Sequence, residues 1–171
     1  MAKFQPIQDI SEIALEGQSR LHPIQASSRD VYGHFEVTIG EDGQLDLSAP
    51  ISGHVEVLVE DLKSMNPLYD REVRKRLNIR RFPKIQADII EIRERLEQNR
   101  YLVVGDIAFN GVTQRAEGEL AVRQISQERL EVQGELTIDV RDFKVEPPNL
   151  FMVGIMPTVQ VNLRLMMRPV D

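Results

Sequence analysis

Hydrophobic and polar residues alternate with a period of two along most of the chain after residue 30. Successive side chains of a β-strand point to opposite faces, so this alternation predicts strands with one buried and one solvated face. The clearest cases are 31–39, 130–140 and 159–167. Strands that are apolar on one side only are typical of antiparallel sheets.

Turn residues separate the predicted strands. Asn110-Gly111 is the strongest hairpin signal, because a two-residue type I′ turn requires positive φ at both positions. Gln98-Asn99 and residues 126–128 predict two further turns. Residues 40–43 predict a hairpin loop, after which Leu45 and Leu47 begin a short return strand.

The number and spacing of these strands favour one closed all-β domain over residues 1–171. We count eight to ten strands joined by short turns, with a β-bulge where the apolar parity changes near Ile89 and Ile90. A meandering barrel and a sandwich both fit such a series, and a barrel has the advantage that it leaves no long open edge.

One segment, 66–77, breaks the alternation and predicts a short amphipathic helix on the β-structure. Asn66 is a favourable N-cap residue, and Pro67 suits the first helical position. At helical spacing the segment has an apolar stripe of Tyr69, Val73 and Leu77 and a basic face of Arg71, Arg74 and Lys75.

Composition narrows the classes of function. The chain has no cysteine, which excludes disulfides, thiol catalysis and cysteine-bound metal. Its net charge of −6 argues against a general affinity for nucleic acid. No apolar run is long enough to span a membrane, and the first residues do not resemble a signal peptide, so we expect a cytoplasmic protein.

Candidate catalytic and metal-binding groups are sparse. Serine-nucleophile, phosphate-loop and paired-histidine zinc motifs are missing, so we expect no enzyme activity, no catalytic residue and no metal. His34 and His54 sit at outward positions of their strands, which favours plain surface histidines over a metal site. Asp106 is either a buried acid with a raised pKa or, as we favour, a solvent-facing charge opposite a basic residue of the next strand.

A basic run interrupts this acidic protein. Six of the eleven residues from Arg71 to Arg81 are basic. They would suit an anionic headgroup or peripheral contact with a membrane surface. The alternative, which we favour, is a solvated helix face whose arginines pair with Glu72 and with acids on adjacent strands.

Four segments occur in a characteristic order: Arg81-Phe82-Pro83 before the strand 84–90, then 104–113, 140–145 and the closing strand 158–167. Their order and spacing resemble the YceI-like family of lipid-binding, lipocalin-like barrels. The resemblance covers residues 20–168. Arg141 departs from the family pattern, which has a serine there.

The resemblance implies an extended antiparallel barrel of about eight strands that holds an amphiphilic lipid, such as a polyisoprenoid or an isoprenoid quinone, for transport, storage or sequestration. No other cofactor is expected. The alternative is a non-enzymatic scaffold whose barrel is packed solid and whose surface forms a partner contact or a homodimer. The candidate lining residues are Phe35, Phe82, Phe109, Phe143, Phe151 and Met156, with Arg80 or Arg81 near a headgroup.

Overall fold

A computed structural model describes residues 1–19, 23–145, 149–150 and 153–170, and 63% of the chain is strand. The elements are β1 (Ala2–Pro6), β2 (Glu12–Ser19), β3 (Pro23–Ser28), β4 (Tyr32–Val37), β5 (Ser52–Leu58), the 3-10 turn η1 (Val59–Asp61), α1 (Pro67–Lys75), β6 (Lys84–Glu97), β7 (Arg100–Phe109), β8 (Val112–Ser126), β9 (Arg129–Asp139), the 3-10 turn η2 (Val140–Phe143), β10 (Asn149–Leu150) and β11 (Val153–Val170).

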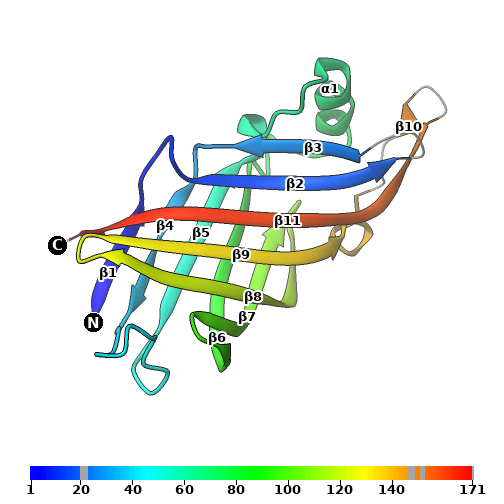
Figure 1. Cartoon of the computed structure of the whole chain (residues 1–171). Coiled ribbons are helices and arrows are strands. Elements are labelled where there is room, and N and C mark those ends of the chain that lie inside the picture. Colours follow the sequence, from blue (N-terminus) through cyan, green and yellow to red (C-terminus); the bar gives the residue numbers. More distant parts are fainter. Residues whose placement is uncertain (20–22, 146–148, 151–152, 171) are drawn as a thin grey trace.

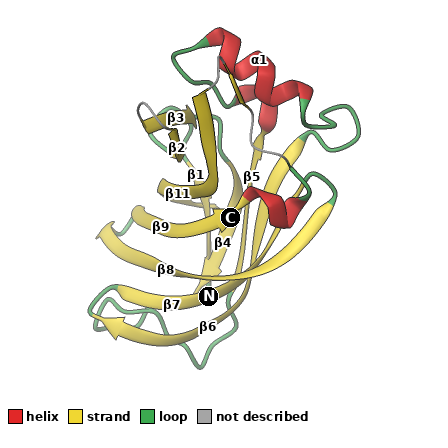
Figure 2. Ribbon diagram, turned by 90° about the vertical axis from the view of Figure 1, so that its right-hand side faces the viewer, coloured by secondary structure: helices red, strands yellow, loops and turns green. Residues whose placement is uncertain are grey.

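The strands form the closed antiparallel barrel that the alternation predicts. Strands β4 to β9 follow one another as a meander, and β11 pairs with β9. β1 then pairs with both β11 and β4, which closes a ring of eight strands. The curl of this sheet is visible in Figure 1 and, after a quarter turn, in Figure 2.

Two further strands extend the barrel beyond the ring. β2 pairs with the first half of β11, and β3 pairs with β2 as the last strand of the sheet. A single bridge between Ser27 and Lys63 joins β3 to the segment that precedes α1. α1 and β10 lie at the end of the molecule opposite the two chain termini (Figure 1).

Most local predictions are confirmed. Asn99, Asn110 and Gly111 have φ values of 65°, 53° and 77°, as their turns require. The register of β6 against β7 shifts between Ile89 and Glu91, where the bulge was expected. The predicted helix forms, and the side chain of its N-cap residue Asn66 accepts backbone hydrogen bonds at 3.1 and 3.3 Å.

The predicted return strand at Leu45 and Leu47 is wrong. It is reduced to one bridge between Ile39 and Leu45, because the Asp46 side chain accepts a hydrogen bond from the backbone N–H of Ser48 at 3.0 Å and turns the chain. Leu45 is buried, whereas Leu47 is exposed. β1, β2 and β3, all of which precede residue 31, were not predicted from the alternation.

The main core fills the end of the barrel that lies away from α1. Side chains from β1, β4, β9 and β11 meet there with less than a tenth of their surface exposed. A second, smaller core lies under η2. The first cluster includes Phe4, Val31, Phe35, Val37, Val57, Tyr101, Val122, Leu130, Leu165 and Met167, and the second is built on Ile107, Phe143 and Val145.

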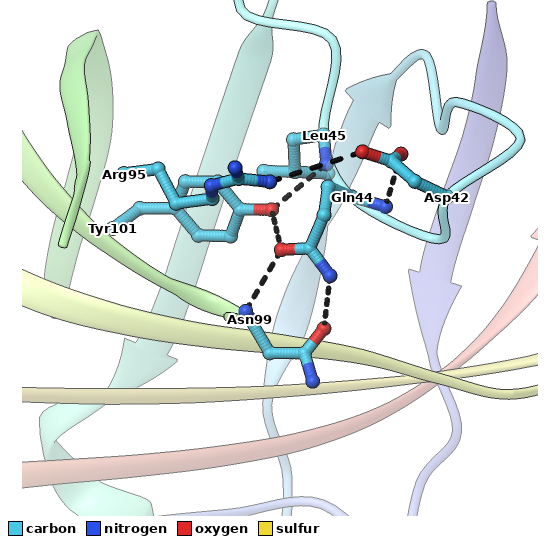
Figure 3. Close-up of polar contacts among 6 residues, drawn as sticks. All are labelled: Asp42, Gln44, Leu45, Arg95, Asn99 and Tyr101. Atoms are coloured by element: carbon cyan, nitrogen blue, oxygen red, sulfur yellow. Dashed lines mark hydrogen bonds and ion pairs between the residues drawn. The ribbon is translucent and has the colours of Figure 1, made fainter. Parts of the chain in front are cut away.

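A buried hydrogen-bond network closes this end (Figure 3). The Tyr101 hydroxyl, which is fully buried, accepts from the backbone N–H of Leu45 at 2.8 Å and donates to Oε1 of Gln44 at 3.1 Å. That same oxygen accepts from the backbone N–H of Asn99 at 2.8 Å, and Nε2 of Gln44 donates to Oδ1 of Asn99 at 2.9 Å. The network therefore fastens the loop after β4 to the β6–β7 turn.

Replacing Tyr101 with phenylalanine tests this closure. The variant keeps the ring but leaves the buried Leu45 N–H without its acceptor, which we expect to lower the free energy of unfolding by about 1–3 kcal/mol. The measurement is urea denaturation followed by circular dichroism. Tyr32→Phe is the control, because Tyr32 is 47% exposed and its loss of a hydroxyl should change stability by less than about 0.5 kcal/mol. Equal stability of the two variants would contradict the closing role.

Candidate functional site

The barrel encloses a cavity of about 330 Å³ between the main core and α1. Most of its surface is apolar and is supplied by inward positions of the strands together with one face of the helix. Its volume lies at the lower end of the range of about 300–1,000 Å³ that is usual for small-molecule sites. The lining residues include Leu15, Ile24, Val55, Ile85, Val103, Leu136, Val161 and Leu163.

Small inward residues leave this space unfilled. Gly17 of β2, Gly105 of β7 and Gly118 of β8 all border the cavity, as do Ala87 and Ala116. At Gly17 the atom nearest to the position of a Cβ is the backbone oxygen of Ile24, 3.9 Å away, so a Cβ there would make only an ordinary van der Waals contact. At Gly105 and Gly118 a Cβ would lie 2.8 and 3.0 Å from a backbone oxygen of the neighbouring strand, so these positions do not accept a larger side chain without a shift of that strand. The small residues of the lining therefore leave part of the barrel interior unfilled.

The helix covers the end of the cavity that the main core does not close. Tyr69, Val73 and Leu77 are half-buried and line the cavity, as the predicted apolar stripe requires, but no residue of α1 itself is fully buried. Burial raises the pKa of the Tyr69 phenol, and the neighbouring carboxylate of Asp70 adds to the effect. We call this end of the barrel the mouth.

The structure brings some of the candidate lining residues together and separates others. Phe35, Phe109 and Met156 border the cavity. Phe143 is buried behind the wall, where its ring lies 5.7 Å from that of Phe109, and it is not among the lining residues. Phe82 lies outside the cavity, against the turn glycine Gly111. Phe151 falls outside the described residues.

The two candidate headgroup arginines do not line the cavity. Arg80 and Arg81 are exposed, and the guanidinium of Arg81 lies 5.3 Å from the centre of the Phe82 ring. Arg74, which the helical pattern placed on the outward face, instead borders the cavity, and its Nη2 donates to the backbone oxygen of Glu60 at 3.1 Å. This correction arises because the helix crosses the mouth, so one side of it meets the rim.

The alternation pattern did not predict the part of the lining that β2 and β3 contribute. Leu15, Ile24 and Ala26 lie on strands that were not predicted. The sequence does indicate that the lining contains small residues, since Gly105 and Gly134 both occur at inward positions of otherwise apolar strands. Glycine inside a strand is a mark of reduced packing at that position.

Several ionisable residues border the cavity, among them His34, His54, Glu56 and Asp88. Asp106 does not line it and pairs with Arg115 of β8, its cross-strand partner, at 3.2 Å, which confirms the solvent-facing interpretation. His34 and His54 stack with ring centres 6.0 Å apart, and Nδ1 of His54 lies 2.7 Å from Asp88. Among the described residues, no cluster of three or more acidic, histidine or cysteine side chains could hold a metal ion.

The described part of the chain contains no helix that is both long and apolar enough to cross a membrane.

Comparison with known proteins gives a family and a set of similar folds. The family model described as YceI-like domain matches residues 12–167. Among solved structures, a polyisoprenoid binding domain from Saccharophagus degradans, implicated in plant cell wall breakdown, is 15% identical with a TM-score of 0.77, over 99% of this chain and 100% of that one. Burkholderia cenocepacia BcnA is 16% identical with a TM-score of 0.75, over 91% and 95% of the two chains.

A third similar structure is the Campylobacter jejuni YCEI protein, which is 10% identical with a TM-score of 0.66 over 83% of this chain and 82% of that one. At these identities the likeness concerns the fold. No curated protein matches the chain.

The position of α1 over the mouth can be tested by titrating Tyr69. Because burial disfavours the charged phenolate, the pKa of this phenol should lie above the ordinary tyrosine value of about 10. The measurement is the ultraviolet difference titration between the wild type and Tyr69→Phe, which isolates this one phenol. A midpoint at or below the ordinary value would mean that the helix does not pack on the mouth.

Proposed function

The chain belongs to the YceI-like family, and we propose that it is a binding protein that holds one amphiphilic lipid in the barrel cavity. The lipid we propose is a polyisoprenoid or an isoprenoid quinone, with its methyl-rich chain inside. The role we propose is transport, storage or sequestration, since reversible burial of a chain requires no chemical step.

The observation that carries the proposal is the apolar, unfilled cavity inside the barrel. Its walls present side chains such as Leu15, Val103 and Leu163, which can contact a hydrocarbon chain but offer no hydrogen bond. Each Å² of such surface removed from water contributes about 25 cal/mol. The polar end of the ligand would lie at the mouth, near Tyr69 and Arg74, where the lining meets solvent.

The alternatives fit the cavity less well. A scaffold with a solidly packed barrel would have side chains in contact across its axis, whereas this barrel leaves about 330 Å³ open. An enzyme acting on the bound lipid would need a catalytic group placed against it, and Asp106, the residue considered for that role, pairs with Arg115 and does not border the cavity. One chain encloses the cavity, so binding in it does not require a dimer.

The first experiment is native mass spectrometry of the protein purified from its own host, followed by organic extraction and identification of the released molecule. A bound polyprenol or isoprenoid quinone supports the proposal and identifies the ligand. An empty protein that also fails to take up an added polyprenol or quinone while fully folded contradicts it.

Filling the cavity from β2 provides a sharper test. We expect Gly17→Phe to weaken binding of a purified polyprenol at least about tenfold, or about 1.4 kcal/mol, because the new ring occupies the space of the chain. Binding is measured by native mass spectrometry, since the protein has no tryptophan to report it by fluorescence. Gln18→Phe is the matched control, because Gln18 is exposed on the opposite face of the same strand. Equal loss in both variants, or no loss in Gly17→Phe while it remains folded, would contradict the proposal.

A further inference from the structure

The mouth carries a charge opposite to that of the rest of the protein. Residues 63–84, which include α1, contain eight Lys or Arg and only two Asp or Glu, although the whole chain has a net charge of −6. The remaining residues are therefore strongly acidic. This separation gives the molecule one basic end, at the mouth of the cavity.

The two acidic residues of this segment are engaged locally. Glu72 pairs with Arg76 at 3.0 Å and lies 3.9 Å from Lys75, as the solvated-face interpretation expected. Asp70 accepts hydrogen bonds from the backbone N–H and the hydroxyl of Ser64 at 3.0 and 2.7 Å.

Three arginines of the basic end have no acidic partner of this kind in the described part of the chain. Arg71, Arg80 and Arg81 are exposed, and within the described ranges no carboxylate lies at salt-bridge distance from any of them. Their charges face solvent beside the mouth. They are thus available to an anionic partner without the loss of an existing ion pair.

Exposed apolar side chains accompany these arginines. Met65, immediately before α1, is 100% exposed, and Leu68 in its first turn is 55% exposed. Met156 borders the cavity and is itself 53% exposed, so it lies on the rim of the mouth. Large apolar residues with more than half of their surface in water, gathered beside unpaired arginines, are typical of a surface that enters a membrane interface.

We propose that the protein docks mouth first on bilayers that contain anionic phospholipid. Arg71, Arg80 and Arg81 contact the phosphate groups, and Met65 and Leu68 enter the interface. A soluble polyanion would satisfy the arginines but would leave these two apolar side chains in water, so a bilayer fits the surface better. The acidic remainder of the protein is repelled by the same membrane, which fixes the orientation.

This docking surface would bring the opening of the cavity to the membrane. It does not rest on the proposed cavity ligand, because the arginines and apolar residues concerned lie on the outside. The Gly17→Phe variant, which fills the cavity, should therefore bind vesicles as the wild type does, and failure of one proposal is distinguishable from failure of the other.

The experiment is co-sedimentation of the full chain with large unilamellar vesicles, of phosphatidylcholine alone or of phosphatidylcholine with about one third phosphatidylglycerol. We expect at least about tenfold stronger binding to the anionic vesicles, falling as salt is raised to about 0.5 M, because the charges that act across solvent are screened. Equal binding to both vesicle types, or no binding to either, would overturn the proposal.

Matched variants separate the two components of the surface. Arg71→Gln, Arg80→Gln and Arg81→Gln combined should abolish the preference for anionic vesicles. The control is Arg95→Gln, Arg129→Gln and Arg168→Gln, three exposed residues near the end of β6, at the start of β9 and near the end of β11. It removes equal charge away from the mouth and should retain the preference. Met65→Ser with Leu68→Ser should also weaken binding.

The control for the apolar pair is Leu96→Ser with Ile125→Ser, two exposed residues at the far ends of β6 and β8. If the control arginine variant or the control apolar variant loses as much vesicle binding as the matching variant at the mouth, the proposed mouth-first orientation is wrong. If Met65→Ser with Leu68→Ser binds anionic vesicles as the wild type does, insertion of the mouth is wrong.

Discussion

The architecture depends on how the two edges of the sheet are joined through β1. This five-residue strand pairs with β4 on one side and with the last residues of β11 on the other. Where β1 ends, the Ile7 N–H donates to the Met166 oxygen at 2.8 Å, and the Met166 N–H donates to the buried Ser11 hydroxyl at 3.1 Å. These two bonds satisfy the backbone N–H and oxygen of Met166, which lies between the part of β11 that pairs with β1 and the part that pairs with β2. β11 can therefore pass from one partner to the other without an unpaired buried amide.

The mouth results from the change of strand pairing between β1 and β2. β2 continues along the same edge of β11 but pairs outward with β3 instead of β4, so only one end of the barrel is closed by backbone hydrogen bonds. The closed end is packed and is sealed by the Tyr101 network, whereas the other end is covered by α1, which has no fully buried residue. The main buried core and the helix without a fully buried residue thus lie at opposite ends of the molecule, and segments with little burial are the ones that open most readily.

The cavity has a cost that the rest of the fold must offset. An unfilled apolar volume forgoes dispersion contacts that a packed core would make, and small residues such as Gly105 and Gly118 add no burial of their own. The core at the closed end provides compensating burial through residues such as Phe35 and Leu130. Packing at one end therefore permits a hollow at the other, which is the arrangement that a carrier of a long apolar chain requires.

The residue pattern along the chain predicted β4 to β9 and β11, the turns at Asn99 and Asn110, and the helix that begins after Asn66, because these features depend on residues adjacent in the chain. The sequence also indicated the family, through the order of several local segments. It did not reveal β1 to β3. β1 and β2 pair with β11, more than a hundred residues away, and β3 joins the sheet only through β2. Nor did the sequence distinguish Phe109, which lines the cavity, from Phe82, which lies against a turn outside it. Alternation assigns a side chain to one face of a strand, but only the pairing of distant strands and the path of the helix decide whether that face meets a packed core, an open cavity or solvent.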